Sequence, residues 1–254
     1  MKATDSIWKA CRGEEQMVPV SGALFRMVKK QEQIATWQIV ENLDEQAELE
    51  DLIEEKISAV SNLPKEDELH ILLKAPFRYP PLQWGSRFGR THEPSIFYGG
   101  CSVDATLAEL AYYRFVYLMD IDTQFEESLQ SQHTMFSIGY QSEKGIRLQD
   151  PPFDQHHDLI AHPSNYSHAQ QLGAEMRVAE VEVFEYPSSR AADHAPCVGI
   201  FTPGNFTQNY PLSQEDWLSE LTADTVTFKS MGSRIVKTYS ISDFFHNGEF
   251  PKPA

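Results

Sequence analysis

One carboxylate stands out in the sequence because it lies in an otherwise apolar stretch. Residues 105–119 read ATLAELAYYRFVYLM, and only Glu109 and Arg114 among them are charged. A helix that is apolar on nearly all sides is expected to be buried. A buried carboxylate is costly unless another group pairs with it or uses it. Glu109 is therefore a candidate functional residue, and a buried salt bridge to a nearby arginine is the alternative.

Two further residues precede Glu109 at equal spacing, Arg87 and then Tyr98. A guanidinium can bind phosphate oxygens through two parallel hydrogen bonds, and tyrosine offers a flat ring and a hydroxyl. Arginine, tyrosine and glutamate at one site would suit a bound, charged nucleotide. The alternatives are a surface arginine in a Gly/Pro-rich loop and a core tyrosine at the end of a strand.

Several familiar motifs do not occur in the sequence. It has no G-x-x-x-x-G-K-[ST] or G-x-G-x-x-G loop, which argues against P-loop and Rossmann nucleotide binding. It also has no G-x-S-x-G elbow of a serine hydrolase. His156, His157 and His162 lie in a polar stretch but lack the carboxylate or cysteine spacing of a zinc site. No metal is therefore expected.

The chain of 254 residues is acidic, with a formal net charge of −16, and its lysines and arginines are scattered. Because phosphate neutralisation dominates nonspecific affinity for DNA and RNA, we expect no direct nucleic acid binding. A few focused arginines can still form a local site for a small anion in an acidic protein.

The sequence shows no feature that directs a protein to a membrane. No run approaches the roughly 18 apolar residues of a membrane span, and the first residues lack the apolar middle of a signal peptide. The three cysteines, Cys11, Cys101 and Cys197, follow no paired pattern, which indicates reduced thiols. These features predict a cytoplasmic protein without membrane association.

The order of helix-like and strand-like segments favours an α+β fold with mixed β-sheets flanked by helices. Apolar periodicity predicts helices over residues 43–60, 105–119 and about 167–178. Strands are expected at both ends of 22–40 and over residues 69–73, 96–98, 181–186, 197–202, 225–229 and 234–239. A Pro-rich turn over 76–90 and an irregular, polar segment over 120–163 separate these elements.

We predict one domain over residues 21–254, preceded by a loosely ordered lead-in over residues 1–20. An acidic helical insertion occupies about residues 42–66 of this domain, and a C-terminal extension occupies about residues 204–254. The acidic run is most simply interpreted as a solvated helix face.

Several short segments together resemble the RES domain family, whose name comes from an arginine, a glutamate and a serine. The resemblance begins with GSRF at 85–88, IFY at 96–98 and ATLAE at 105–109. It extends to LFRMV at 24–28, YSHAQQLG at 166–173, YPSSR at 186–190 and CVGIF at 197–201, in the family's order. It implies a single domain similar in fold to ADP-ribosylating toxins, and the activity of bacterial toxins that degrade NAD.

The resemblance also implies the site residues. The family's functional positions fall on Arg26, Arg87, Tyr98, Glu109 and Ser167. Glu109, Arg87 and Ser167 are expected to be catalytic. NAD is expected to bind to Arg26, Arg78, Tyr98, Arg87 and Ser188.

Three of these assignments have alternatives. A long insertion separates the first arginine segment from Arg87, so either Arg26 or Arg78 could fill the first arginine's position. Ser167 and Gln170 fit a capping box, in which both side chains bind free amides of a helix start. Ser188 would ordinarily be a turn residue.

The expected reaction is cleavage of the nicotinamide–ribose bond of NAD, with phosphate or water as acceptor. Its transition state resembles an oxocarbenium ion, as in glycoside hydrolysis, so negative charge near the ribose is required. Nicotinamide leaves as a neutral molecule, and no general acid is needed. Glu109 would supply the charge, and the arginines would hold the pyrophosphate.

The resemblance implies a toxin of a toxin–antitoxin pair, restrained by a helix-turn-helix antitoxin of the Xre type. Two alternatives remain open: an ADP-ribosyltransferase that modifies a protein, and a non-catalytic nucleotide-binding protein on the same fold. The sequence does not decide between phosphate, water and a protein side chain as acceptor, or between a monomer and a homodimer.

Overall fold

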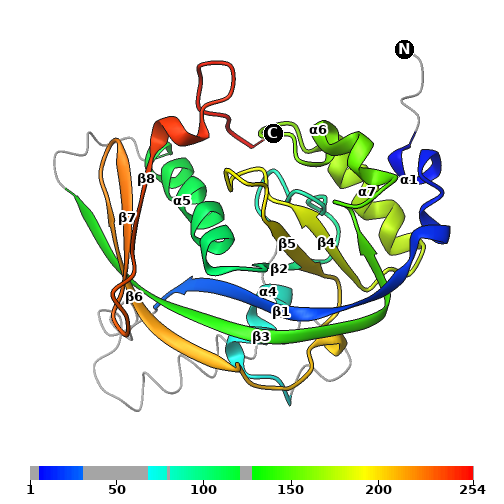
Figure 1. Ribbon diagram of the computed structural model, residues 1–254, viewed down its shortest axis with the longest axis horizontal. Helices are drawn as coiled ribbons and strands as arrows, with labels where there is room; N and C mark the ends of the chain where they lie inside the picture. The colour runs from blue at the N-terminus through cyan, green and yellow to red at the C-terminus, as the bar shows by residue number, and fades with distance from the viewer. Residues whose placement is uncertain (1–5, 31–67, 79–80, 121–127, 254) are drawn as a thin grey trace.

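The strands of the protein form one branched, mixed sheet in the computed structural model (Figure 1), which describes residues 6–30, 68–78, 81–120 and 128–253. Eight strands follow the order β1-β2-β5-β4-β3-β6-β7-β8, with an additional pairing of β1 and β3. Their bounds are Val18–Lys29 (β1), Phe97–Gly100 (β2), Leu129–Arg147 (β3), Val183–Pro187 (β4), Pro196–Ile200 (β5), Ser213–Leu221 (β6), Thr225–Ser230 (β7) and Val236–Ser240 (β8).

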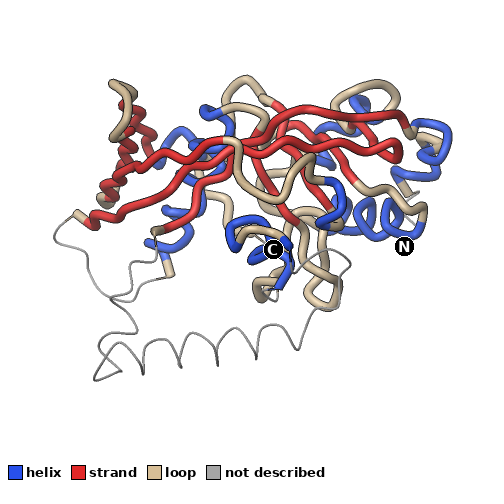
Figure 2. The backbone as a smooth tube through the Cα atoms, turned by 90° about the horizontal axis from the view of Figure 1, so that it is seen from below, coloured by secondary structure: helices blue, strands red, loops and turns tan. Residues whose placement is uncertain are grey.

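The two long strands β1 and β3 belong to both branches of the sheet. They pair antiparallel from Val18↔Gly145 to Lys29↔His133 and run side by side across the molecule (Figure 2). In one branch β6, β7 and β8 continue from the first half of β3. In the other, β4 pairs parallel with the end of β3, and β5 and β2 lead back to β1. This combination confirms the predicted α+β fold with a mixed sheet.

Helices flank the sheet on two sides (Figure 1). The α-helices span Ile7–Ala10 (α1), Ile71–Arg78 (α4), Val103–Met119 (α5), His157–Ile160 (α6) and Ser167–Val178 (α7). Shorter 3-10 turns span Gly13–Gln16 (η1), Phe153–His156 (η3), Pro203–Asn205 (η4) and Ile241–Phe244 (η5). In the described part of the chain, no helix is both long and apolar enough to cross a membrane.

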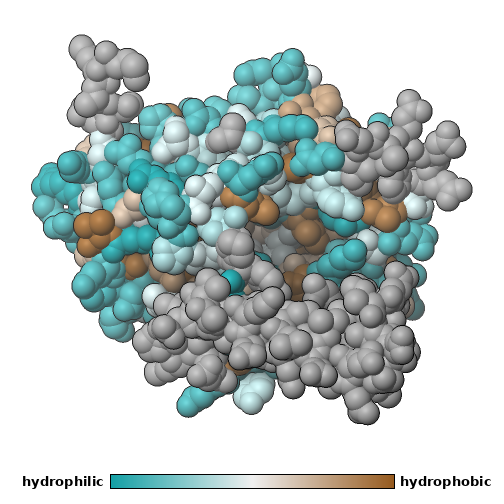
Figure 3. Space-filling model, turned by 180° about the vertical axis from the view of Figure 1, so that it is seen from behind, coloured by the Kyte–Doolittle hydropathy of each residue, from teal (hydrophilic) through white to brown (hydrophobic). Residues whose placement is uncertain are grey.

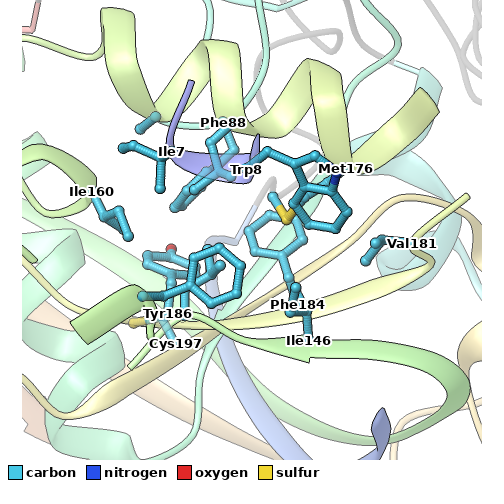
Figure 4. Packing of buried hydrophobic residues seen from close by; sticks show 14 of the residues in the cluster. Ile7, Trp8, Phe88, Ile146, Ile160, Met176, Val181, Phe184, Tyr186 and Cys197 are labelled. Carbon is cyan, nitrogen blue, oxygen red and sulfur yellow. The ribbon is translucent and has the colours of Figure 1, made fainter. Parts of the chain in front are cut away.

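Three clusters of buried side chains hold these layers together. The helix α5 packs against the β6–β8 branch through residues such as Phe115, Trp217 and Phe228. A second cluster lies within the branch that closes on β1. The third joins α1 and α7 to β4 and β5, with Trp8 and Met176 facing Phe184 (Figure 4).

The apolar helix is present, and a local signal explains where it begins. The structure starts α5 at Val103, two residues before the predicted start, because Ser102 Oγ accepts a hydrogen bond from Ala105 N at 3.1 Å. The helix predicted over residues 167–178 is also present, as α7, and its observed bounds are the same. The predicted helix over 43–60 and the acidic insertion lie outside the described residues.

Two expectations about local structure are wrong. Residues 6–20 are not a loose lead-in, because Ile7, Trp8 and Cys11 are buried in the core and β1 already begins at Val18. Residues 69–73 do not form a strand: most of them belong to α4. A short apolar run cannot distinguish a strand from a buried helix.

The expected irregular segment 120–163 contains β3, the longest of the described strands. Its polar residues suggested a loop, but several of them are buried because they bond across the sheet. His133 Nε2 lies 2.8 Å from Ser219 Oγ, and Ser137 Oγ lies 2.6 Å from Ser213 Oγ. These pairs join β3 to β6, a strand that was not predicted.

Candidate active site

A cavity of about 390 Å³ opens between β1, β2, α5 and the loop that precedes β2. This volume lies within the range of about 300–1,000 Å³ typical of small-molecule pockets. Four residues singled out in the sequence line it: Arg26, Arg87, Tyr98 and Glu109. The fold therefore brings together side chains that are far apart along the chain.

The helix α5 presents one stripe of residues to the cavity. Thr106, Glu109, Leu110 and Tyr113 all line it, at the spacing of one helical face. Glu109 is half-buried, and its Oε1 accepts a hydrogen bond of 2.6 Å from Ser188 Oγ. Among the described residues Glu109 forms no ion pair within 4.0 Å, so the alternative of a buried salt bridge is not observed there.

The hydroxyl of Ser188 is fixed in direction. Ser188 is fully buried, and its Oγ accepts hydrogen bonds of 3.0 Å from the backbone N–H groups of Arg190 and Ala191. A serine hydroxyl has two acceptor lone pairs and one proton. With both lone pairs engaged, the proton of Ser188 points to Glu109, whose Oε1 accepts the hydrogen bond.

Arg87 is a buried positive charge with a fixed orientation, and its side chain is 6% exposed. Nη1 donates to the carbonyl oxygens of Ile160 (3.4 Å) and His162 (2.8 Å), Nη2 donates to Ser189 Oγ, and the guanidinium lies over the Tyr166 ring. These bonds use three of its five N–H groups. Burial lowers the pKa of Arg87, but Tyr166 and then Glu109, with smaller effects from two further tyrosines, outweigh burial and raise the pKa above its ordinary value.

Tyr98 holds the loop that carries Arg87. Its hydroxyl lies 2.9 Å from Ser86 Oγ and accepts a bond of 3.2 Å from Phe88 N, and burial raises its pKa to about 12. The ring lines the cavity. The hydroxyl of this residue, which the sequence predicts to bind NAD, is thus already bonded to the neighbours of Arg87.

Sequence reasoning missed how α7 supports this loop. Gln170 Nε2 donates to the carbonyl oxygens of Trp84 (3.0 Å) and Ser86 (3.1 Å). A Cβ atom on Gly173 would lie 1.9 Å from Phe88 O, so only glycine permits this close approach. The sequence signal was present, because Gln170 stood out as a capping residue.

The predicted capping box at Ser167 does not form. The helix α7 begins at Ser167 itself, whose Oγ donates to Asn165 Oδ1 at 2.7 Å, while Asn165 Oδ1 also accepts from Ser167 N. Gln170 is engaged with the Arg87 loop instead of the helix start. Ser167 is exposed and is not among the residues that line the cavity.

The two candidates for the first arginine lie in different places. Arg26, on β1, lines the cavity, and its Nη1 donates to Tyr98 O at 2.6 Å. Burial lowers its pKa to about 10, so its guanidinium is charged at neutral pH. Arg78 is buried in α4 and does not line the cavity.

Three further residues complete the wall beside Glu109: Tyr113, Tyr186 and Cys197. Burial raises the pKa of all three well above its ordinary value, and the nearby charge of Glu109 adds to this effect. Their side chains are therefore neutral, and Glu109 is the negative group of the cavity. Tyr113 could have been found from the sequence, because it lies one helical turn after Glu109.

Comparison with known proteins gives one family. The family model described as RES domain matches residues 63–219, more than half of the chain. No curated protein matches the sequence. Among solved structures, the chain is similar to one in the crystal structure of the M. tuberculosis MbcT–MbcA toxin–antitoxin complex, with a TM-score of 0.47, 9% identity, and coverage of 86% of this chain and 93% of that one.

Proposed function

Because the chain belongs to the RES domain family, we propose that it is an enzyme that degrades NAD by cleaving the nicotinamide–ribose bond. One observation carries the proposal: Glu109, oriented by the buried Ser188 hydroxyl, lines a cavity that the cations Arg26 and Arg87 also line. A single carboxylate in a cavity that two cations also line suits a ligand with an anionic part and a part that becomes cationic.

Glu109 has the central role in the reaction. As the bond to nicotinamide breaks, positive charge develops on the ribose, and an oriented carboxylate stabilises that charge. The departing nicotinamide takes the electrons of the broken bond and becomes neutral, so it needs no proton from the enzyme. Water or phosphate then bonds to the ribose carbon.

The cations of the site bind the pyrophosphate and place the ribose beside Glu109. Arg87 suits this role because its remaining N–H groups are held in one orientation by the bonds to Ile160, His162 and Ser189. Arg26 contributes a second positive charge from β1.

We assign the serine's role to Ser188 and not to Ser167, since Ser188 contacts Glu109 and Ser167 is exposed.

In the cell, we propose that the enzyme is the toxin of a toxin–antitoxin pair. Unrestrained loss of NAD would stop growth, so a protein that covers the cavity would have to restrain the enzyme. An antitoxin of the Xre type binds DNA and has a basic surface, to which a chain with a net charge of −16 is complementary.

The direct test is to incubate the purified protein with NAD, with and without inorganic phosphate, and to identify the products. We expect nicotinamide together with ADP-ribose or its phosphate adduct, and neither product from Glu109→Gln. ADP-ribose attached to protein would instead indicate an ADP-ribosyltransferase. Binding of NAD without turnover would indicate a non-catalytic binding protein.

A further inference from the structure

Residues 245–253 follow η5 and lie beyond the region matched by the family model, which ends at residue 219. In Figure 1 this segment passes above α5. It contacts the structure around Arg87 along two routes, one through Tyr112 and one through His162. These contacts have no role in the proposed chemistry, which raises the question of what they do.

The first route begins where the segment meets α5. The Phe250 ring stacks on the Tyr112 ring, with centroids 5.2 Å apart and planes 15° apart, and Tyr112 Oη donates to Pro251 O at 2.6 Å. Tyr112 is fully buried. The guanidinium of Arg190 lies over the same ring, 3.3 Å from its centroid. A charged group this close to an aromatic face gains a favourable cation–π interaction.

Arg190 extends this route to the loop around Arg87. Its Nη2 donates to Pro163 O at 2.5 Å and to Tyr166 Oη at 3.1 Å. The Arg87 guanidinium in turn lies 4.6 Å from the centroid of the Tyr166 ring. Rings and guanidinium groups thus form a continuous series of contacts from Phe250 to Arg87.

The second route is shorter. The ring of His246 packs against that of His162, with centroids 5.8 Å apart. The carbonyl oxygen of His162 accepts the 2.8 Å bond from Arg87 Nη1. Both routes therefore end on residues 160–166, the backbone segment that supplies two of the three hydrogen-bond acceptors of Arg87.

We propose that residues 245–253 are a strap that positions Arg87 by holding the segment 160–166 in place, with Phe250 and Tyr112 as its positioning residues. The structural part of this inference is independent of the proposed function. Only the expected effect of the strap on NAD binding rests on the proposed function. Neither residue lines the cavity, so both act through Arg190 and the 160–166 segment. A loosened strap would leave Arg87 with mobile acceptors and a less defined orientation.

The test compares Phe250→Ala with Lys252→Ala, a matched control on the same segment. Lys252 forms an exposed ion pair with Asp120, whose expected contribution to stability is small. Hydrogen–deuterium exchange of residues 160–166 is measured first, because it requires no substrate. We expect exchange at least about 10-fold faster in Phe250→Ala, corresponding to about 1.4 kcal/mol, and unchanged in Lys252→Ala and Phe250→Tyr.

The same variants are then assayed with NAD. Phe250→Ala should raise KM several-fold with a smaller effect on kcat, and Phe250→Tyr should restore both values. Unchanged exchange at 160–166 in a folded Phe250→Ala protein would overturn the strap. If Phe250→Ala does not fold, Phe250→Leu, which removes the ring that stacks on Tyr112 but keeps an apolar side chain, decides the question by the same exchange measurement. If wild type does not cleave NAD, only the proposed function fails.

Discussion

At the scale of single residues, the pair of Ser188 and Glu109 determines what the cavity can do. The hydroxyl proton of Ser188 has one available direction, and Glu109 accepts the hydrogen bond that it makes. The neutral groups around the carboxylate make its charge the main negative feature of the site. A preoriented charge of this kind needs no reorganisation as the transition state forms.

Replacing Glu109 by Gln keeps the shape of the side chain but removes its charge. We predict that turnover of NAD falls at least about 100-fold, while NAD still binds. Steady-state kinetics and a thermal shift with NAD measure the two effects. Near-normal turnover by a folded Glu109→Gln protein would refute the role assigned to Glu109.

The two candidate serines can be separated by parallel substitutions. Ser188→Ala removes a hydrogen bond to a charged group, and such bonds contribute about 1.5–3 kcal/mol. We therefore expect kcat to fall by about 10- to 100-fold. Ser167→Ala should leave kcat unchanged, because the Ser167 hydroxyl bonds to Asn165, away from the cavity. The opposite pattern would assign the role to Ser167.

The two candidate arginines allow a similar comparison. Arg26→Ala should weaken NAD binding by about 10-fold or more through the loss of a charge-assisted bond to phosphate. Arg78 does not line the cavity, so Arg78→Ala should affect stability more than affinity. Titration with NAD, together with urea unfolding, measures both. Loss of affinity in Arg78→Ala alone would show that Arg78, and not Arg26, fills the position of the family's first arginine.

At the scale of elements, the junction of β3 and β6 is held by buried polar pairs, and His133 gives it a dependence on pH. His133 is 2% exposed. Burial, together with the positive charge of Arg114, lowers its pKa from the ordinary 6.5 to about 4. As the pH falls, the unfolded chain therefore takes up a proton at this position before the folded protein does.

This difference in pKa between the unfolded and folded states determines how the stability of the protein changes with pH. The contribution of neutral His133 to stability is complete above pH 6.5 and is lost as the pH falls from 6.5 toward 4. We predict a loss of about 2–3 kcal/mol in the free energy of unfolding between pH 7 and pH 4.5 from this group. Urea unfolding of His133→Gln should lack this component, whereas the exposed His92→Gln should retain it. Identical pH profiles for wild type and His133→Gln would contradict the assignment.

At the scale of the whole molecule, a small cationic cavity is set in an acidic protein. On the face shown in Figure 3, hydrophobic residues occur as separate patches among hydrophilic ones. The net charge of −16 opposes binding of polyanions over the surface as a whole. Selectivity for a small anionic ligand then comes from the partly buried Arg26 and the buried Arg87 at the site.

Expression in a heterologous bacterium tests the proposed toxin role. Induced wild-type protein should lower intracellular NAD and stop growth, because no restraining partner is present. Glu109→Gln, expressed to the same level, should do neither. Normal growth with unchanged NAD in cells that make wild-type protein would refute the toxin role.

The sequence alone determined the features that depend on local pattern. The apolar helix and its single carboxylate, the bounds of α7 and the α+β class follow from side-chain periodicity, which neighbouring residues set. The motifs around Arg87, Tyr98 and Glu109 also indicate the family by themselves, because each motif is a short run of adjacent residues.

Only the tertiary structure decided which polar residues meet. Burial of polar side chains in β3 depends on hydrogen bonds from β6, a strand distant in sequence, and local polarity therefore predicted a loop. The contact of Ser188 with Glu109, the support of the Arg87 loop by Gln170, and the place of Arg26 in the cavity depend equally on long-range pairing. The number of residues between two positions does not predict how far apart they lie in the folded protein, because that distance depends on which strands pair in the sheet.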